Sequence, residues 1–194
     1  GARAMTGTSG GGFCLMAEYF GLAGITETPI VIFEAQRPGP ATGLPTRTEQ
    51  GDLNQLIGAS QGDFPKIILA PGTQEECFYA AIEAFNLADR FQCPVIISMD
   101  LALSESMATI DSLNVDNVPI IRPIKAKGDN GKYKRYIDTT TGISPISFPG
   151  DPGLMFVGSS DEHDEDDRLL SDVRAGLPEM LKARQKQMDK RMRK

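Results

Sequence analysis

Residues 29–50, PIVIFEAQRPGPATGLPTRTEQ, join an apolar run to a loop rich in proline, glycine and threonine. The run Pro29 to Glu34 is typical of a buried strand in a parallel sheet. Ligands of an open α/β sheet bind at the carboxyl ends of the strands, where this loop begins. Arg37 could therefore hold a carboxylate or phosphate through two parallel hydrogen bonds, although most loop arginines are solvated surface charges.

The rest of the first half repeats this strand-and-helix pattern. Residues 2–5 are expected to be the tail of a short strand. Further strands are expected over 66–70 and 93–100, and helices over 13–24, 53–57 and 74–91. Thr73 and Glu76 form a capping-box pattern at the start of the last of these helices. Continuous apolar strands that alternate with helices predict an α/β fold, part of a doubly wound parallel sheet, followed by an irregular arm and a C-terminal helix.

Three regions are expected along the chain: an α/β domain over 1–101, an extended arm over 102–160, and an acidic turn with a helical segment over 161–194. His163, the single histidine, lies among carboxylates that lack metal-ligand spacing, so a solvated acidic turn is predicted there and no metal site. Beyond it, an apolar stripe is expected to be buried, with the basic residues of 182–194 exposed. Its members are Val173, Leu177, Met180, Leu181, Met188 and Met192.

Composition excludes several classes of function. The formal net charge of -6 over 194 residues argues against general nucleic-acid binding. No apolar run approaches the roughly 20 residues that span a bilayer. The three cysteines form no C-x-x-C pair, and the first residues lack a signal-peptide pattern, so a cytoplasmic location is expected.

The glycine-rich segment Thr8-Ser9-Gly10-Gly11-Gly12 precedes the first expected helix. It could present backbone N–H groups to an anion, or it could be only a tight turn. It matches neither the dinucleotide fingerprint nor the P-loop. No nucleophile and base stand in a catalytic spacing, so the residues alone indicate a binding surface and no self-contained catalytic set.

The loop also carries a family resemblance. Gln36, Arg37, Gly39, Pro40, Thr42, Gly43, Pro45 and Thr46 match the Gln-Arg-x-Gly-Pro-Ser-Thr-Gly-x-Pro-Thr loop of the alpha subunits of 2-oxoacid:ferredoxin oxidoreductases, above all the 2-oxoglutarate type. Ala41 replaces the usual serine. The segments Gly142-Ile143-Ser144-Pro145, Phe148-Pro149-Gly150 and Glu162-His163-Asp164-Glu165 extend the resemblance over nearly the whole chain.

The resemblance implies an enzyme that decarboxylates a 2-oxoacid with thiamine diphosphate and magnesium, passes electrons through an iron–sulfur cluster to ferredoxin, and forms an acyl-coenzyme A. The metal, the diphosphate site and the cluster are expected on a beta subunit. Arg37, Thr42 and Thr46 are the expected substrate-binding residues, and Thr8, Ser9, Gly10 and Gly11 the expected pocket wall.

The family's upstream cofactor-binding glutamate and its following domain are not found, so an internal fragment that is inert by itself is expected. Two alternatives remain open. One is an anion- or nucleotide-binding α/β protein that uses the glycine-rich turn, and the other is a non-catalytic assembly subunit.

Overall fold

The computed structural model describes residues 2–128, 133–171 and 176–194. Its centre is a four-stranded, all-parallel sheet in the order β1-β2-β4-β3. The strands are β1 (Met5–Thr8), β2 (Ile30–Gln36), β3 (Ile67–Leu69) and β4 (Pro94–Asp100). The α/β fold predicted from the continuous apolar runs is confirmed.

The two central strands form the longest pairing in the sheet. Strand β2 pairs with β4 from Ile30 opposite Pro94 to Gln36 opposite Asp100. The residues of β4 from Pro94 to Met99 are buried throughout. A parallel strand covered on both faces requires this continuous apolar character.

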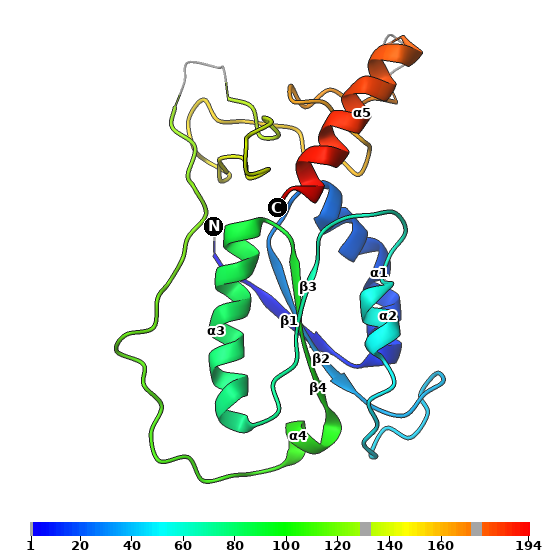
Figure 1. The fold of residues 1–194 in the computed structure, drawn as a ribbon, viewed down its shortest axis with the longest axis vertical. Helices are drawn as coiled ribbons and strands as arrows, with labels where there is room; N and C mark the ends of the chain where they lie inside the picture. Colours follow the sequence, from blue (N-terminus) through cyan, green and yellow to red (C-terminus); the bar gives the residue numbers. More distant parts are fainter. Residues whose placement is uncertain (1, 129–132, 172–175) are drawn as a thin grey trace.

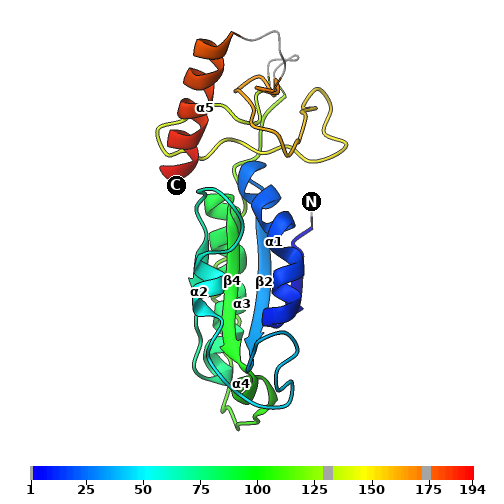
Figure 2. The ribbon, with the colours of Figure 1, turned by 90° about the vertical axis from the view of Figure 1, so that its right-hand side faces the viewer.

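Helices cover both faces of the sheet (Figures 1 and 2). The helices α1 (Gly10–Ile25) and α2 (Leu53–Ile57) lie on one face, where Phe13, Phe20 and Leu56 pack against Ile32 and Ile96. The helix α3 (Gln74–Phe91) lies on the other face, where Ala84 and Ala88 pack against Val31, Val95 and Ile97. Side chains of successive strand residues therefore alternate between two cores.

The boundaries near the amino terminus differ from the prediction. Met5–Thr8 is a strand and α1 already begins at Gly10, so the gap between the expected strand tail at 2–5 and the expected helix at 13–24 shrinks to Ser9. Glycine tolerates both strand and helix geometry, and three glycines in succession gave no warning that the helix starts among them. Thr73 is confirmed as the N-cap of α3, since its Oγ1 accepts a hydrogen bond from the Glu76 backbone at 3.1 Å, whereas the Glu76 carboxylate accepts from the Gly72 backbone at 2.7 Å and not from that of Thr73.

After the short helix α4 (Leu101–Glu105), described residues 106–171 form no helix or strand and only two isolated bridges. Within this segment Tyr136 is fully buried, and its ring lies 3.7 Å from that of His163, centroid to centroid. His163 is only 1% exposed, so the prediction of a solvated turn is wrong for this residue. Burial lowers the pKa of His163 below its ordinary value, which keeps the ring neutral against Tyr136. The division into three regions stays a prediction.

The last helix, α5 (Leu177–Met192), reverses the burial expected from its sequence. Leu177, Leu181 and Met192 are exposed, whereas Lys190 and Arg191 are buried. Val173 lies outside the described residues. The apolar-stripe prediction is wrong because the buried side of this helix is charged, and hydropathy cannot identify such a face. None of the helices in the described ranges has the length and apolar character needed to cross a membrane.

The partner of α5 is Glu27, which follows α1 and is fully buried. Lys194 Nζ lies 2.6 Å from Glu27 Oε2, and Lys190 Nζ pairs with Oε1. Arg135 donates to the Glu27 carbonyl at 2.7 Å. Burial alone would raise the pKa of Glu27, but Lys194, Lys190 and Arg135 outweigh it and lower the pKa to about 2. This buried cluster attaches α5 to the end of α1, beyond the amino ends of the strands (Figure 1).

Replacing Glu27 should therefore weaken the fold. We expect Glu27→Gln to lower the free energy of unfolding by about 3 kcal/mol, because it leaves two buried lysines without their carboxylate. Urea denaturation measures the change. The matched control is Glu83→Gln on the exposed side of α3, which should be neutral. Equal stabilities for the Glu27 and Glu83 variants would contradict this role.

The same cluster sets an acid dependence. The folded pKa of Glu27, about 2, lies below its ordinary value of 4.5, so its contribution is fully present above pH 4.5. That contribution is lost as the pH falls toward 2, because the unfolded chain then binds the extra proton. Unfolding free energies measured from about pH 6 down to about pH 3 should fall less steeply in Glu27→Gln than in the parent chain.

Candidate functional site

The loop that carries Arg37 leaves the carboxyl end of β2, at the opposite end of the sheet from α5 (Figure 1). Residues 39–51 are exposed, whereas Arg37 is half-buried. The Nε atom of Arg37 is buried and has no hydrogen-bond partner among the described residues. A buried guanidinium N–H without a partner is costly, so this group is suited to an anion that the chain itself does not supply.

The loop has a defined conformation. Gly39-Pro40 is a cis peptide, and Ala41 and Gly43 have φ values of 55° and 54°. The Leu44 backbone donates to the Pro38 carbonyl at 3.2 Å. A Cβ on Gly43 would lie 1.8 Å from that same carbonyl oxygen, so only glycine fits. The expected substrate-binding hydroxyls of Thr42 and Thr46 both lie on the exposed part of this loop.

The amino terminus of α1 packs directly against the loop. A Cβ on Gly10 would lie 2.6 Å from Asp52 Oδ2, and one on Gly11 would lie 3.4 Å from the Ala41 carbonyl oxygen. The expected pocket wall therefore does adjoin the expected substrate loop at Gly10 and Gly11, with Thr8 and Ser9 half-buried beside them. Their roles stay predictions. The Asp52 carboxylate occupies the space beside the helix terminus, where a bound anion would otherwise lie.

Sequence reasoning missed a buried cluster of hydrogen-bonded polar residues beneath the loop. The Asp52 backbone donates to Gln36 Oε1 at 3.0 Å, and Gln36 Nε2 donates to Ser98 Oγ at 3.1 Å. Ser98 Oγ donates in turn to Glu34 Oε2 at 3.4 Å. Burial first, and then Asp52, raise the pKa of Glu34 to about 8. The available clue was a glutamate at the end of an otherwise apolar strand.

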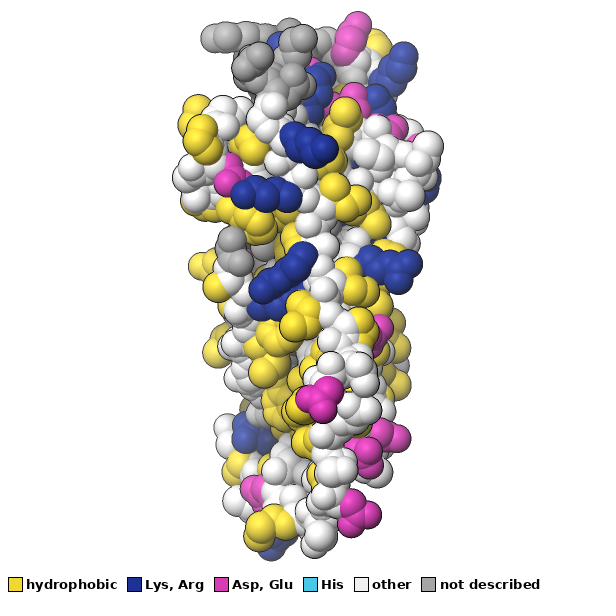
Figure 3. Space-filling view, turned by 90° about the vertical axis from the view of Figure 1, so that its left-hand side faces the viewer, with side chains coloured by type: hydrophobic (Ala, Val, Ile, Leu, Met, Phe, Trp, Pro, Cys, Tyr) yellow, Lys and Arg dark blue, Asp and Glu magenta, His cyan; other side chains and the backbone are white. Residues whose placement is uncertain are grey.

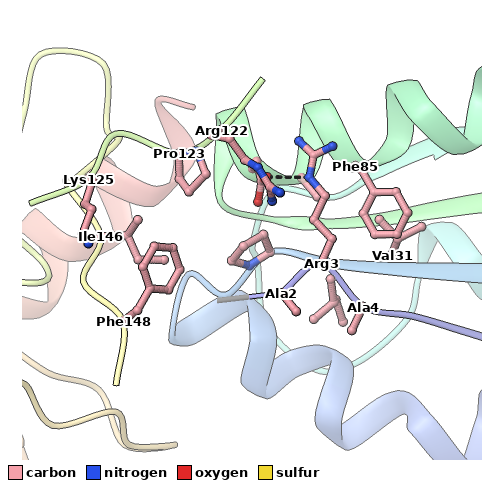
Figure 4. Close-up of a pocket in the computed structure, with 14 residues that line it drawn as sticks. Ala2, Arg3, Ala4, Val31, Phe85, Arg122, Pro123, Lys125, Ile146 and Phe148 are labelled. Carbon is pink, nitrogen blue, oxygen red and sulfur yellow. Dashed lines mark hydrogen bonds and ion pairs between the residues drawn. The ribbon is translucent and has the colours of Figure 1, made fainter. Parts of the chain in front are cut away.

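Away from the Arg37 loop, a hollow of about 370 Å³ lies at the amino ends of the strands (Figure 4). Lys and Arg side chains gather on this face of the molecule with apolar side chains between them (Figure 3). The cations that line the hollow are paired within the chain: Arg3 lies 2.9 Å from Asp89, Arg122 lies 4.0 Å from the same carboxylate, and Lys125 lies 3.0 Å from Asp151. Because each of these cations already has a carboxylate partner in the chain, this hollow is a weaker anion site than the region of Arg37.

The family was established by comparison with known proteins. A family model described as "Pyruvate flavodoxin/ferredoxin oxidoreductase, thiamine diP-bdg" matches residues 1–176. The chain belongs to this family. The resemblance stated on the loop motif is therefore confirmed, and the α/β sheet is that of a thiamine diphosphate-binding domain.

Individual relatives agree with this assignment. The alpha subunit of 2-oxoacid:ferredoxin oxidoreductase 1 from Sulfurisphaera tokodaii is 45% identical over 175 residues, which are 89% of this chain and 28% of that protein. The 2-oxoglutarate synthase subunit KorA from Archaeoglobus fulgidus is 51% identical over 100 residues, 52% of this chain and 29% of that protein.

A solved structure supports the fold over nearly the full chain. It is the 2-oxoglutarate:ferredoxin oxidoreductase from Magnetococcus marinus with 2-oxoglutarate, coenzyme A and succinyl-CoA bound. The TM-score is 0.88 at 34% identity, and the match covers 99% of this chain and 33% of that one. The chain thus spans about a third or less of the length of these relatives.

The contact between α1 and the loop can be tested at two adjacent glycines. We expect Gly10→Ala to lower the free energy of unfolding by about 1–3 kcal/mol, because the added methyl displaces the Asp52 carboxylate. Gly11→Ala is the matched control and should change it by less than about 0.5 kcal/mol. Urea denaturation compares the two. Equal effects would show that Asp52 moves aside freely.

Proposed function

We propose that this chain is the part of an alpha subunit of a 2-oxoacid:ferredoxin oxidoreductase that binds the substrate carboxylate. The observation that carries the proposal is the buried, unpartnered Nε of Arg37 at the carboxyl end of β2. The complete enzyme would convert a 2-oxoacid and coenzyme A to carbon dioxide and an acyl-CoA, with two electrons passing to ferredoxin. The guanidinium of Arg37 suits the binding of the substrate carboxylate, because it stays charged and its fork of N–H groups matches the plane of a carboxylate.

The substrate is proposed to be 2-oxoglutarate. Relatives at 51% and 37% identity, from Archaeoglobus fulgidus and Mycobacterium tuberculosis, are named for 2-oxoglutarate, as is the solved structure. Other relatives at 45% identity are named only for 2-oxoacids. Thr42 and Thr46 are proposed to contact the substrate from the exposed loop.

The residues of this chain fit the substrate side of the pocket better than the metal side. Thiamine diphosphate would supply the nucleophilic carbon that attacks the keto group. In the described ranges no three His, Cys, Asp or Glu side chains gather in a way that could hold a metal ion. We therefore propose that magnesium, the diphosphate contacts and the iron–sulfur cluster belong to a beta subunit in a cytoplasmic complex, and we assign this chain the task of orienting the 2-oxoacid.

The nucleotide-binding alternative is less well supported. The Asp52 carboxylate adjoins Gly10 and would repel a phosphate at the amino terminus of α1. If the chain is instead a non-catalytic assembly subunit, replacing Arg37 should leave the turnover of the complete enzyme unchanged.

The complete enzyme tests this proposal. We expect Arg37→Ala to reduce kcat/KM for 2-oxoglutarate about 10- to 100-fold, mostly through KM, because a hydrogen-bonded ion pair to the substrate is lost. Reduction of a viologen dye, dependent on 2-oxoglutarate and coenzyme A, measures the rate.

The matched control is Arg47→Ala. Arg47 lies on the same loop and is exposed, and the one described hydrogen bond of its side chain goes to the neighbouring Thr46 carbonyl. It should retain near-normal kinetics. Equal losses in both variants would indicate a general effect of loop charge, and no loss at Arg37 would favour an assembly role.

A further inference from the structure

An almost closed ring lies beneath the Arg37 loop, formed by the side chains of Gln36, Ser98 and Glu34 and by the backbone N–H and the side chain of Asp52. Asp52 is joined to Gln36, Gln36 to Ser98, and Ser98 to Glu34 by the hydrogen bonds given above. Gln36 directly precedes the loop and Asp52 follows it, so the ring connects the two ends of the segment that carries Arg37.

The gap in the ring lies between two carboxyl groups. Glu34 Oε1 and Asp52 Oδ2 are both buried and lack partners when both groups are treated as carboxylates. Two adjacent buried carboxylates would repel each other, and neither could donate a hydrogen bond. One proton placed between them removes the repulsion and satisfies both oxygens at once.

The surroundings indicate which group holds that proton. Asp52 lies beside the amino terminus of α1, where the helix dipole favours negative charge. Glu34 is 0% exposed, and burial with the nearby Asp52 raises its pKa to about 8. Its register partner on β1 is Thr8 and its partner on β4 is Ser98, and neither of these titrates. From α1, over the same face, the buried residues nearest the loop are Gly10 and Phe13, so Asp52 is the titratable group that acts on Glu34.

We propose that Glu34 is a positioning residue: its protonated Oε1 donates to Asp52 Oδ2, closes the ring, and holds the Arg37 loop in its binding conformation. The proton stays on Glu34, and no bond other than this hydrogen bond forms or breaks. The consequence for substrate binding rests on the proposed function of Arg37, whereas the anchoring of the loop does not.

The proposal predicts a dependence on alkaline pH. Glu34 keeps its proton below about pH 8 and loses it above, so the ring opens as the pH rises. If only the closed form binds substrate, KM should be about tenfold higher at pH 9 than at pH 7. Glu34→Gln cannot ionise, but its amide can donate to Asp52 and accept from Ser98, so its KM should lack this rise.

The first experiment measures KM for 2-oxoglutarate in the complete enzyme at both pH values. The ratio of the parent KM to the Glu34→Gln KM cancels other titrating groups. We expect this ratio to rise about tenfold between pH 7 and pH 9. Glu18→Gln, an exposed change on α1, serves as the control and should follow the parent.

The second experiment does not depend on activity. Trypsin can cut the loop after Arg47. It does not cut after Arg37, because the next residue is Pro38. Cleavage after Arg47 should be about tenfold faster in Glu34→Leu than in the parent or Glu34→Gln, because one buried hydrogen bond is lost. Ser98→Ala, which opens the ring at another point and removes only a hydroxyl, should also be cleaved faster.

The two readouts separate the two proposals. Faster cleavage in Glu34→Leu and Ser98→Ala, with a KM ratio that does not change between pH 7 and pH 9, would support the anchor and overturn Arg37 as the clamp. Unchanged cleavage in both variants would overturn the anchor, whatever the KM ratio.

Discussion

The pairing of β2 with β4 is the interaction on which the rest of the structure depends. It runs from Ile30 opposite Pro94 to Gln36 opposite Asp100, and parallel strands bring their carboxyl ends to the same edge. This register places Ser98 opposite Glu34, within reach of Gln36. A shift of one residue would turn these polar side chains toward α3 and the apolar ones away from their cores. The apolar contacts of the sheet therefore fix the polar geometry below the loop.

The two buried glutamates show how surroundings determine the chemistry of one residue type. Glu27 lies among Lys190, Lys194 and Arg135 and has a pKa of about 2. Among the described residues no such cation acts on Glu34, and its pKa is raised to about 8. One carboxyl group is thus a fixed negative charge that holds two segments together, and the other is a neutral hydrogen-bond donor. Only the structure separates these roles, because the groups that act on each carboxyl lie far from it along the chain.

Sequence alone predicted most of the sheet and the position of the loop. Continuous apolar strands such as 93–100 are typical of a buried parallel sheet, and the loop motif around Arg37 is specific to its family. The burial of Lys190 and His163 could not be predicted, because a charged or polar side chain is buried only when a distant partner compensates it. Those partners, Glu27 and Tyr136, lie far away along the chain, and no local pattern connects them.

The length of α1 determines how strongly the loop end and the α5 end of the molecule can influence each other. Its sixteen residues correspond to about 24 Å, with Gly10 against Asp52 at one end and Glu27 just beyond the other. Groups so far apart, with no shared partner, contribute to the free energy almost additively. The alkaline titration beneath the loop and the acid titration at the far end are thus thermodynamically separate, so natural variation could retune substrate affinity without altering how α5 is attached.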